Sequence, residues 1–316
     1  MIKPVIDWLV YEIFKMPHGA ILSEAVDFFL YDTIKIFLLL IVIIFIVSII
    51  RTFFSPEKTR AILSQKRTYA GNVLASLLGI VTPFCSCSAV PLFLGFVEAG
   101  VPLGVTFSFL VASPMINEVA LIMLWGMFGW KVALLYIGSG LVVAIASGIV
   151  IGHLKVEDLV EKFDHKKPGS AVLGAEMTVK DRIDFAKDYT LDILKKIWIY
   201  VVIGIGLGAW IHGYVPADFL AKFAGRDNWF AVPLATVVGI PLYSNAAGVI
   251  PLVSALTEKG VALGTALAFM MAVTGLSLPE FLILRRVMKL KLLVIFASVV
   301  GVGIICTGYL FNFILR

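Results

Sequence analysis

The segment GIVTPFCSCSAVPLF (79–93) recurs in degenerate form as GIPLYSNAAGVIPLV (239–253), 160 residues later in the chain. A second pair keeps the same offset: GVPLGVTFSFLVASP (100–114) and GVALGTALAFMMAVT (260–274). Glycines fall at matching positions in both pairs and a proline matches in the first pair, and a chance similarity would not keep all of them at one offset. The sequence therefore predicts a chain built from two copies of one unit.

The composition places this chain in a lipid bilayer. Hydrophobic residues make up 60% of the 316 residues and charged residues 15%, against about 45–50% and about 25% in soluble domains. The net charge of +5 is too modest to indicate a nucleic-acid partner. Six segments are apolar over roughly the 20 residues that a helix needs to cross: 29–50, 101–124, 131–152, 193–211, 261–284 and 292–315. We expect an all-α, multi-pass protein of the inner (cytoplasmic) membrane.

Residues 1–28 differ from the rest of the chain. Trp8, Phe14 and Leu22 alternate there with charged residues, and no continuous apolar core marks a cleavable signal. This pattern predicts an amphipathic helix lying on the membrane surface. The remaining chain is expected to divide into three parts: a first membrane repeat (29–152), a cytoplasmic polar linker (153–192) and a second membrane repeat (193–316).

The distribution of Lys and Arg predicts the orientation in the membrane. Residues 51–68 hold five of them, 153–196 hold nine and 285–291 hold four. Segments rich in these residues stay in the cytoplasm, so we expect these three loops to be cytoplasmic. Three segments are poor in Lys and Arg and are expected outside: 1–27, 125–131 and 212–228.

This orientation constrains the number of crossings. Three apolar segments separate the first two Lys/Arg-rich loops, and three full crossings would put the second loop outside. The conflict disappears if 70–98 is a re-entrant hairpin with its tip at Pro83–Ser88, matched by 229–256 with its tip at Pro241–Asn245. The predicted fold is two inverted repeats, each with three transmembrane helices and one broken-helix hairpin. The alternative, in which 70–98 spans as one kinked helix, stays open.

Broken hairpins at membrane depth point to a binding site. Non-helical backbone survives there where protein packs around it or where it lines a water-filled cavity, and paired broken segments mark the central site of transporters. The residues expected to bind substrate lie at the two tips: Cys85, Ser86, Cys87, Ser88, Tyr243, Ser244 and Asn245. Helix breaks are expected at four prolines: Pro83, Pro114, Pro241 and Pro279. Kinked helices whose small residues allow close packing are the alternative.

The spacing of two cysteines raises a specific hypothesis. Extended backbone after Pro83 would point the side chains of Cys85 and Cys87 the same way, whereas a helix would separate them. Two sulfurs select soft partners such as Cu(I), zinc-group ions or trivalent arsenic, and a following helix N-terminus would favour the reactive thiolate. No metal site is certain, and no cofactor is expected. The alternative is that both cysteines pack as small apolar side chains.

Ionisable residues inside a span are candidates for function. Asn117 and Glu118 stand in the middle of a predicted span, where Glu118 could carry a coupling proton or make a structural hydrogen bond. Glu280 is also a candidate for coupling or gating. Its position near Arg285 and Arg286 favours an ion pair at the membrane interface instead.

The motif TPFCSCSAVPL (82–92), with its degenerate second copy, resembles the predicted-permease family that includes the ArsP-type organoarsenical efflux permeases. The likeness covers both halves, roughly residues 30–150 and 190–315. It implies an inner-membrane efflux permease in which Cys85 and Cys87 are candidate ligands for a trivalent arsenical.

The combined pattern predicts a secondary transporter rather than an enzyme. No phosphate-binding G-x-x-x-x-G-K-[ST] motif is present, so an ion gradient, with protons as the first candidate, or a partner ATPase would supply the energy. The alternative is a membrane thiol redox or transfer enzyme using Cys85 and Cys87, although the C-x-x-C spacing of common redox sites is absent. A metal-sensing or scaffold protein would leave the duplication unexplained. The sequence leaves a homo-oligomer open.

Overall fold

The structure is a computed structural model, and it describes residues 2–17, 20–53, 68–82, 86–98, 100–160, 178–214, 228–242, 246–285 and 287–315. Within these residues nearly every element is a helix, and the one pairing of extended backbone is a single bridge between Val160 and Met288. The all-α prediction is confirmed.

The first half consists of short and long helices in the following order: α1 (Ile2–Asp7), the π-helix η1 (Trp8–Ile13), α2 (Ile21–Phe53), α4 (Thr68–Val81), α5 (Ser86–Glu98), α6 (Leu103–Met115), α7 (Glu118–Phe128) and α8 (Trp130–His153). The second half continues with η2 (Glu157–Leu159), α9 (Val179–Tyr214), α11 (Ala231–Gly239), α12 (Ala246–Glu258), α13 (Leu263–Gly275), α14 (Leu278–Leu284) and α15 (Leu290–Ile314).

Several of these helices have the length and composition of membrane spans. Three helical runs of the described chain qualify: Trp130–His153, Leu263–Leu284 and Leu290–Ile314, the second of which joins α13 to α14. The pair α6 and α7, bent by 47° at its break, would make a fourth. These runs agree with a protein that crosses the membrane several times. The predicted spans 29–50 and 193–211 lie inside α2 and α9.

The predicted span 101–124 is interrupted, because the helix stops at Met115 and resumes at Glu118. Pro114 has no N–H to bond to the preceding turn, which weakens the end of α6. Ile116 and Asn117 then adopt extended backbone angles. The break expected at Pro114 is therefore present, two residues farther along the chain.

The duplication is visible in the helix boundaries. Helices α12, α13, α14 and α15 each begin 160 residues after α5, α6, α7 and α8 respectively. Gly100 and Gly260 both take positive φ angles, +74° and +90°, which glycine adopts most readily. A Cβ atom at Gly79 would lie 2.9 Å from the Cβ of Ala112, and one at Gly239 would lie 2.9 Å from the Cβ of Ala272. The two halves therefore share the same close approach, between α4 and α6 in the first and between α11 and α13 in the second.

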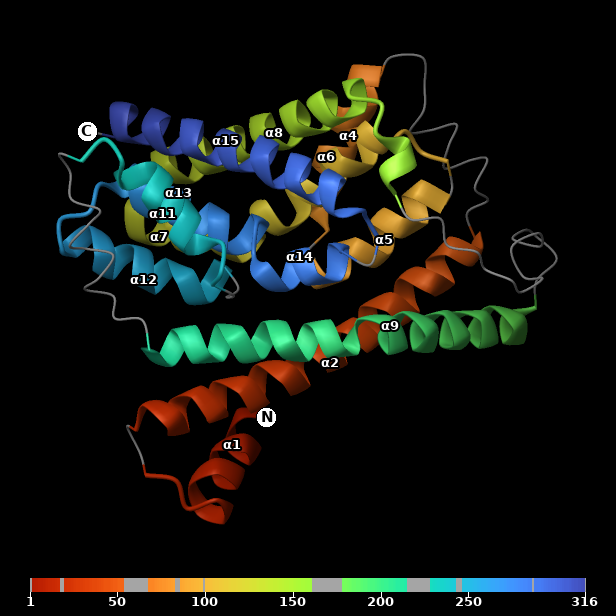
Figure 1. Cartoon of the computed structure of the whole chain (residues 1–316), viewed down its shortest axis with the longest axis horizontal. Coiled ribbons are helices and arrows are strands. Elements are labelled where there is room, and N and C mark those ends of the chain that lie inside the picture. Colours follow the sequence, from red (N-terminus) through yellow and green to blue (C-terminus); the bar gives the residue numbers. More distant parts are fainter. Residues whose placement is uncertain are drawn as a thin grey trace.

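Equivalent helices of the two halves pack against each other. The pairs are α2 with α9, α6 with α13 and α8 with α15. Figure 1 shows α2 and α9 on one flank, α8 and α15 on the opposite flank, and the short helices between them. The colours in Figure 1 also show that the partners in the flanking pairs run in opposite directions. A Cβ atom at Gly303 would lie 2.8 Å from Val143, which fixes the middle of α15 against the middle of α8.

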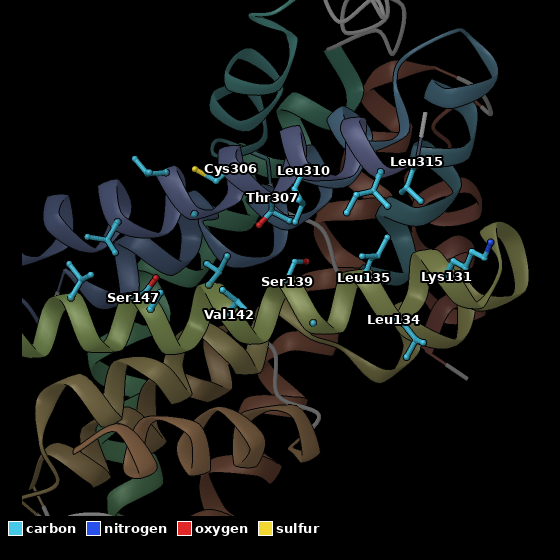
Figure 2. Close-up of a pocket in the computed structure, with 18 of the residues that line it drawn as sticks. Lys131, Leu134, Leu135, Ser139, Val142, Ser147, Cys306, Thr307, Leu310 and Leu315 are labelled. Atoms are coloured by element: carbon cyan, nitrogen blue, oxygen red, sulfur yellow. The ribbon is translucent and has the colours of Figure 1, made fainter. Parts of the chain in front are cut away.

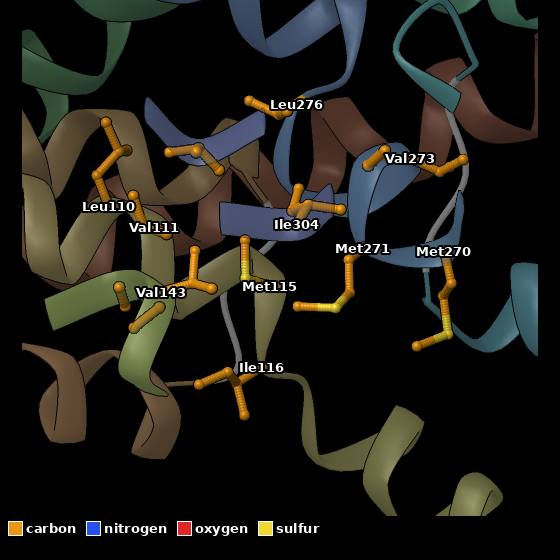
Figure 3. Close-up of a cluster of buried hydrophobic side chains, with 14 of the residues drawn as sticks. Leu110, Val111, Met115, Ile116, Val143, Met270, Met271, Val273, Leu276 and Ile304 are labelled. Carbon is orange, nitrogen blue, oxygen red and sulfur yellow. The ribbon is translucent and has the colours of Figure 1, made fainter. Parts of the chain in front are cut away.

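Short helices between the flanks pack against helices of the opposite half. Helix α5 of the first half packs against α14 of the second, and α7 of the first packs against α12 of the second. At the centre, Met115 of α6 touches Gly275 of α13, the position 160 residues later. Figure 3 shows Met115 and Val143 packed among Met271, Leu276 and Ile304. Because lipid is as apolar as these side chains, close packing rather than burial from water holds the halves together.

Two connecting segments lie at the same end of the molecule. The backbone N–H of Lys289 donates to the carbonyl of Leu159 at 2.9 Å, and its ammonium donates to the carbonyl of Asp158 at 3.1 Å. At the other end, the Tyr309 hydroxyl donates to the carbonyl of Trp229 at 2.6 Å. The described start of the linker and the α14–α15 loop therefore lie at one end of the molecule, in agreement with their expected placement on one side. That this side is the cytoplasm stays a prediction.

The ends of two predicted segments shift. Helix α2 begins at Ile21, so the boundary expected at 28/29 falls inside a helix. Trp8, Phe14 and Leu22 are exposed, and their contact with the membrane surface stays a prediction. Helix α9 begins at Val179, so the end of the predicted linker is a helix continuous with the span.

Candidate functional site

Both predicted hairpins have a break between two helices. Helix α4 ends at Val81, where the Thr82 hydroxyl donates to the carbonyl of Leu78 at 2.8 Å, and α5 begins at Ser86. Helix α11 ends at Gly239, Pro241 follows in the break, and α12 begins at Ala246. Five predicted site residues lie outside the described residues: Pro83, Cys85, Tyr243, Ser244 and Asn245.

The backbone around Cys87 differs from the hypothesis. Ser86, Cys87 and Ser88 form the first turn of α5, so extended backbone does not continue from Cys85 through Cys87. In a helix, each residue turns by about 100° from the one before, so the extended backbone expected after Pro83 does not include Cys87; how Cys85 lies relative to it stays a prediction. Cys87 does lie at a helix N-terminus, where the helix dipole favours a thiolate.

Four helices end near the middle of the molecule. Gly79 near the end of α4 lies against Ala112 near the end of α6, and Gly239 lies against Ala272 of α13 in the same way. The ends of α6 and α13 meet where Met115 touches Gly275. The C-terminal ends of α4, α6, α11 and α13 are therefore gathered together.

The helices that follow, α5, α7, α12 and α14, begin in the same region. The backbone N–H of Leu278 at the start of α14 donates to the carbonyl of Ile240 beyond the end of α11, at 2.9 Å. The cross-contacts of α5 with α14 and α7 with α12 join the two sets. We name this meeting of helix ends the central break region; its described members are Thr82, Ser86, Ile116, Asn117, Ile240, Pro241, Leu242, Ala246, Leu276 and Ser277.

The central break region concentrates backbone polar groups. A helix leaves up to four N–H groups unpaired at its start and four C=O groups at its end. In a bilayer these groups need partners from the protein, from water or from a bound solute. Helix starts attract negative charge and helix ends attract positive charge, so the groups gathered here are of the kind that bind polar solutes and ions.

Asn117 has a clear structural role. Its side-chain Oδ1 accepts hydrogen bonds from the backbone N–H groups of Val119 at 2.8 Å and Ala120 at 3.3 Å. It therefore caps the start of α7. Glu118 follows in the first turn of α7, partly exposed. Its position at a helix break in the middle of the chain's bent span agrees with the sequence analysis, and its role in coupling stays a prediction.

The side chain of Glu280 is 0% exposed, and its expected place at the membrane interface stays a prediction. Helix α14 packs against both α5 and α9, and this packing encloses its first turn. Arg285 is exposed, and its guanidinium donates to the carbonyl of Met288 at 3.3 Å. Pro279 lies in the first turn of α14, where the ring's missing N–H costs no helix hydrogen bond.

Sequence reasoning missed Ser277. Its side chain is 1% exposed, and its Oγ has no hydrogen-bond partner among the described residues. Ser277 stands 160 residues after Asn117 and, like it, precedes the first residue of a helix. The offset together with the sequence Ser-Leu-Pro-Glu (277–280) could have identified it.

A large apolar groove lies elsewhere, between α8 and α15. Its volume is about 1420 Å³, and Ser139, Ser147 and Thr307 are among its few polar lining residues. Figure 2 shows Lys131 and Leu315 near one end of this groove. No residue of the central break region lines it, so it is a separate feature on the flank of the molecule.

No metal cluster is evident in the part of the chain that the structure describes: no three His, Cys, Asp or Glu side chains there are placed to hold an ion. Cys85 lies outside this part. Binding of a soft metal by Cys85 and Cys87 therefore stays a prediction.

Comparison with known proteins gives one family. A family model described as a predicted permease (ArsP_1) matches residues 21–313. A UPF0718 protein of Methanocaldococcus jannaschii is 24% identical over 310 residues, covering 80% of this chain and 85% of the relative. A putative two-component membrane permease complex subunit of Streptococcus mutans is 24% identical, covering 79% and 82%. The UPF0718 protein YraQ of Escherichia coli is also 24% identical, covering 78% and 68%. No solved structure matches the chain.

Proposed function

This chain belongs to the predicted permease family, and from that premise we propose that it is a secondary transporter that moves a small thiophilic solute out of the cell. The solute would bind in the central break region and cross the cytoplasmic membrane there. Broken helices at the middle of a duplicated membrane fold are the usual place for such a site.

The observation that carries this proposal is the opposite direction of equivalent helices. Helices α8 and α15 are equivalent by the 160-residue offset and run antiparallel along one flank. If both cross the bilayer, the two halves have inverted topology, each with three spans and one re-entrant hairpin. Inverted halves can rock around a fixed central site and expose it to each side in turn.

We propose a trivalent organoarsenical as the substrate. Cys85 and Cys87 would supply soft sulfur ligands, and the start of α5 would favour their thiolate form. Support comes from the resemblance of the 82–92 motif to the ArsP-type permeases. The remaining residues proposed to line the site are Ser86, Ser88, Tyr243, Ser244 and Asn245, with Asn117, Glu118 and Glu280 as candidates for coupling or gating.

A membrane thiol enzyme using Cys85 and Cys87 is the competing function. The family match favours transport, because the family model describes a predicted permease and the Streptococcus mutans relative is named a putative permease complex subunit. An enzyme would convert the arsenical chemically, whereas a transporter would deliver it unchanged, so speciation of the accumulated arsenic separates the two.

The name of the Streptococcus mutans relative places it in a two-component complex. We propose that this chain also assembles with other membrane subunits, either copies of itself or a second component. The mass of the particle purified from its native membrane distinguishes a monomer, a homo-oligomer and a hetero-complex.

Uptake of trivalent methylarsenite into inverted membrane vesicles tests the proposal. Wild-type vesicles should accumulate the unchanged arsenical, and Cys85→Ser and Cys87→Ser should each abolish accumulation with normal protein levels. Cys306→Ser is the matched control, since this exposed cysteine lines the groove on the flank. Full transport by the double variant Cys85→Ser/Cys87→Ser would remove the sulfur-ligand proposal.

A further inference from the structure

The groove between α8 and α15 lies where the two halves meet on one flank. These helices are equivalent by the 160-residue offset and run in opposite directions. A close approach joins two equivalent positions, because a Cβ atom at Gly303 would lie 2.8 Å from Val143. Gly138 also lines the groove, and an added Cβ there would have no atom within 4 Å. The helices therefore touch at the first pair and leave open space elsewhere along the groove.

The two ends of the groove differ. Every lining residue between positions 138 and 150 of α8 has a lining counterpart 160 positions later on α15. Beyond this common part, the groove continues toward one end only, along Trp130, Lys131, Leu134, Leu135, Ile314 and Leu315. The residues of α15 that are equivalent to the first four of these do not line it. The duplication accounts for the middle of the groove and not for this extended end.

The extended end has the side chains of a membrane interface. Trp130 lines the groove there and is exposed, and Trp229, whose carbonyl accepts a hydrogen bond from Tyr309 of α15, is exposed at the same end. Tryptophan is enriched at the level of the lipid headgroups. Lys131 is exposed as well, and it has no hydrogen bond or ion pair with the described residues. Figure 2 shows its ammonium group at the end of the groove.

The place of Lys131 in its helix also favours a negatively charged partner. It is the second residue of α8, and the first turn of this 24-residue helix contains no acidic side chain. A helix start attracts negative charge, so a lysine there is on the unfavourable side of the helix dipole. A phosphate group beside Lys131 would compensate the ammonium and the helix start together. The rest of the groove is mainly apolar and suits hydrocarbon.

The length of the extended part corresponds to one leaflet of a bilayer. Lys131 stands 12 residues before Val143 on α8, which is about 18 Å at 1.5 Å per residue. The hydrocarbon of one leaflet is about 15 Å deep, half of the whole core. A phospholipid with its phosphate at Lys131 would therefore end its acyl chains near the contact between Val143 and Gly303.

We propose that the groove between α8 and α15 binds one anionic phospholipid from the leaflet at the Lys131 end. The phosphate group contacts the Lys131 ammonium, and an acyl chain lies along the apolar lining as far as Val143. A second copy of the chain suits this groove less well, because a dry protein interface would bury the ammonium without a counter-charge. The lipid lies where the halves meet, and its binding does not depend on which solute the protein carries.

Native mass spectrometry of the purified full chain tests the charge recognition. Delipidated protein is titrated with phosphatidylglycerol or with phosphatidylcholine of the same acyl chains. The wild type should bind the first phosphatidylglycerol about fivefold more tightly, the effect of one Lys near a membrane surface, and Lys131→Gln should remove this preference. Lys291→Gln is the matched control, because Lys291 is exposed at the equivalent position of α15 and does not line the groove. Equal binding of phosphatidylglycerol by the wild type and Lys131→Gln would overturn the proposal.

Filling the groove tests the place of binding. Gly138→Phe puts a ring into the open space and should weaken phosphatidylglycerol binding about tenfold, the effect of losing about two buried methylene groups. Gly126→Phe on α7 is the control, since an added Cβ there also meets no atom within 4 Å and Gly126 does not line the groove.

Unchanged binding in a folded Gly138→Phe variant would exclude the groove as the site. A wild-type dimer that Gly138→Phe converts to a monomer would make the groove an interface between copies and would also contradict the proposal. If Gly138→Phe does not fold, the comparison of Lys131→Gln with Lys291→Gln decides alone.

Discussion

Helices α7 and α14 begin at the same place in the two halves, yet their polar chemistry differs. Asn117 caps α7 with two hydrogen bonds, and the carboxyl that follows it is partly exposed. Ser277 makes no cap, and the carboxyl three residues later is buried. The two halves thus start these helices at equivalent positions. A few side chains determine whether the helix start is capped or leaves its polar groups uncapped.

The largest expected effect tests whether the halves are inverted. In a chain without its native cysteines, single cysteines placed at Lys155 and Lys289 should react with a membrane-impermeant maleimide from one side only. Cysteines placed at Lys131 and Trp229 should react from the other side only, since these residues lie at the opposite end of α8 and α15. Labelling at Lys155 and Lys131 from the same side would mean that α8 does not cross the bilayer, and the inverted arrangement of the halves would be wrong.

The next effect tests whether the halves share one packing. Gly79→Ala and Gly239→Ala each add a Cβ atom 2.9 Å from an alanine Cβ on the neighbouring helix. Overpacking of this kind costs about 1–3 kcal/mol, so both variants should lower the thermal midpoint by similar amounts. Gly138→Ala is the control, because no atom lies within 4 Å of the added Cβ. A loss in one half alone would show that the two helix contacts are not equivalent.

A smaller effect separates the two helix starts. Asn117→Ala should lower stability by about 1 kcal/mol, the typical value of a lost N-cap, measured by thermal unfolding in lipid nanodiscs. Ser277→Ala should leave stability near the wild-type value, since its Oγ bonds to none of the described residues and removing an unpaired buried hydroxyl is close to neutral. Equal losses in the two variants would mean that Ser277 also supports its helix.

The smallest effect concerns the capping box at the start of α9. Hydrogen bonds from the hydroxyl and the N–H of Thr178 hold the pKa of the exposed Asp181 carboxyl below its ordinary value. The stabilisation is therefore present above the unfolded pKa of about 3.9 and is lost as the pH falls through the folded pKa. Thr178→Val should reduce stability slightly at neutral pH and not at strongly acidic pH. A loss of the same size at both pH values would exclude the carboxylate as its source.

Much of the fold was predictable from local features of the sequence. The constant offset predicted the paired helix boundaries, and apolar length predicted α8 and α15 almost to the residue. Prolines predicted the interruptions near 114 and 241, whereas Pro83 lies outside the described residues. These features depend on residues close together in the chain, where composition and spacing carry the physical information.

The central site was less predictable, because it depends on contacts between distant segments. The helical backbone at Cys87 reflects where α5 begins, and spacing alone did not fix that residue. The burial of Glu280 depends on the packing of α14 against α5 and α9, which no local pattern contains. The ion pair that nearby arginines suggested for Glu280 stays a prediction, because Arg286 lies outside the described residues.

The exchange of partners between the halves also affects how the chain is made. Helix α5 packs against α14, which follows it by about 190 residues. At a ribosomal rate of about 5–20 residues per second, α5 waits roughly 10–40 s for that partner. During this interval the first half sits in the membrane with the unpaired ends of its broken helices uncovered. Lipid cannot satisfy those backbone groups, so the newly made first half depends on the insertion machinery or on water until synthesis of the second half is complete.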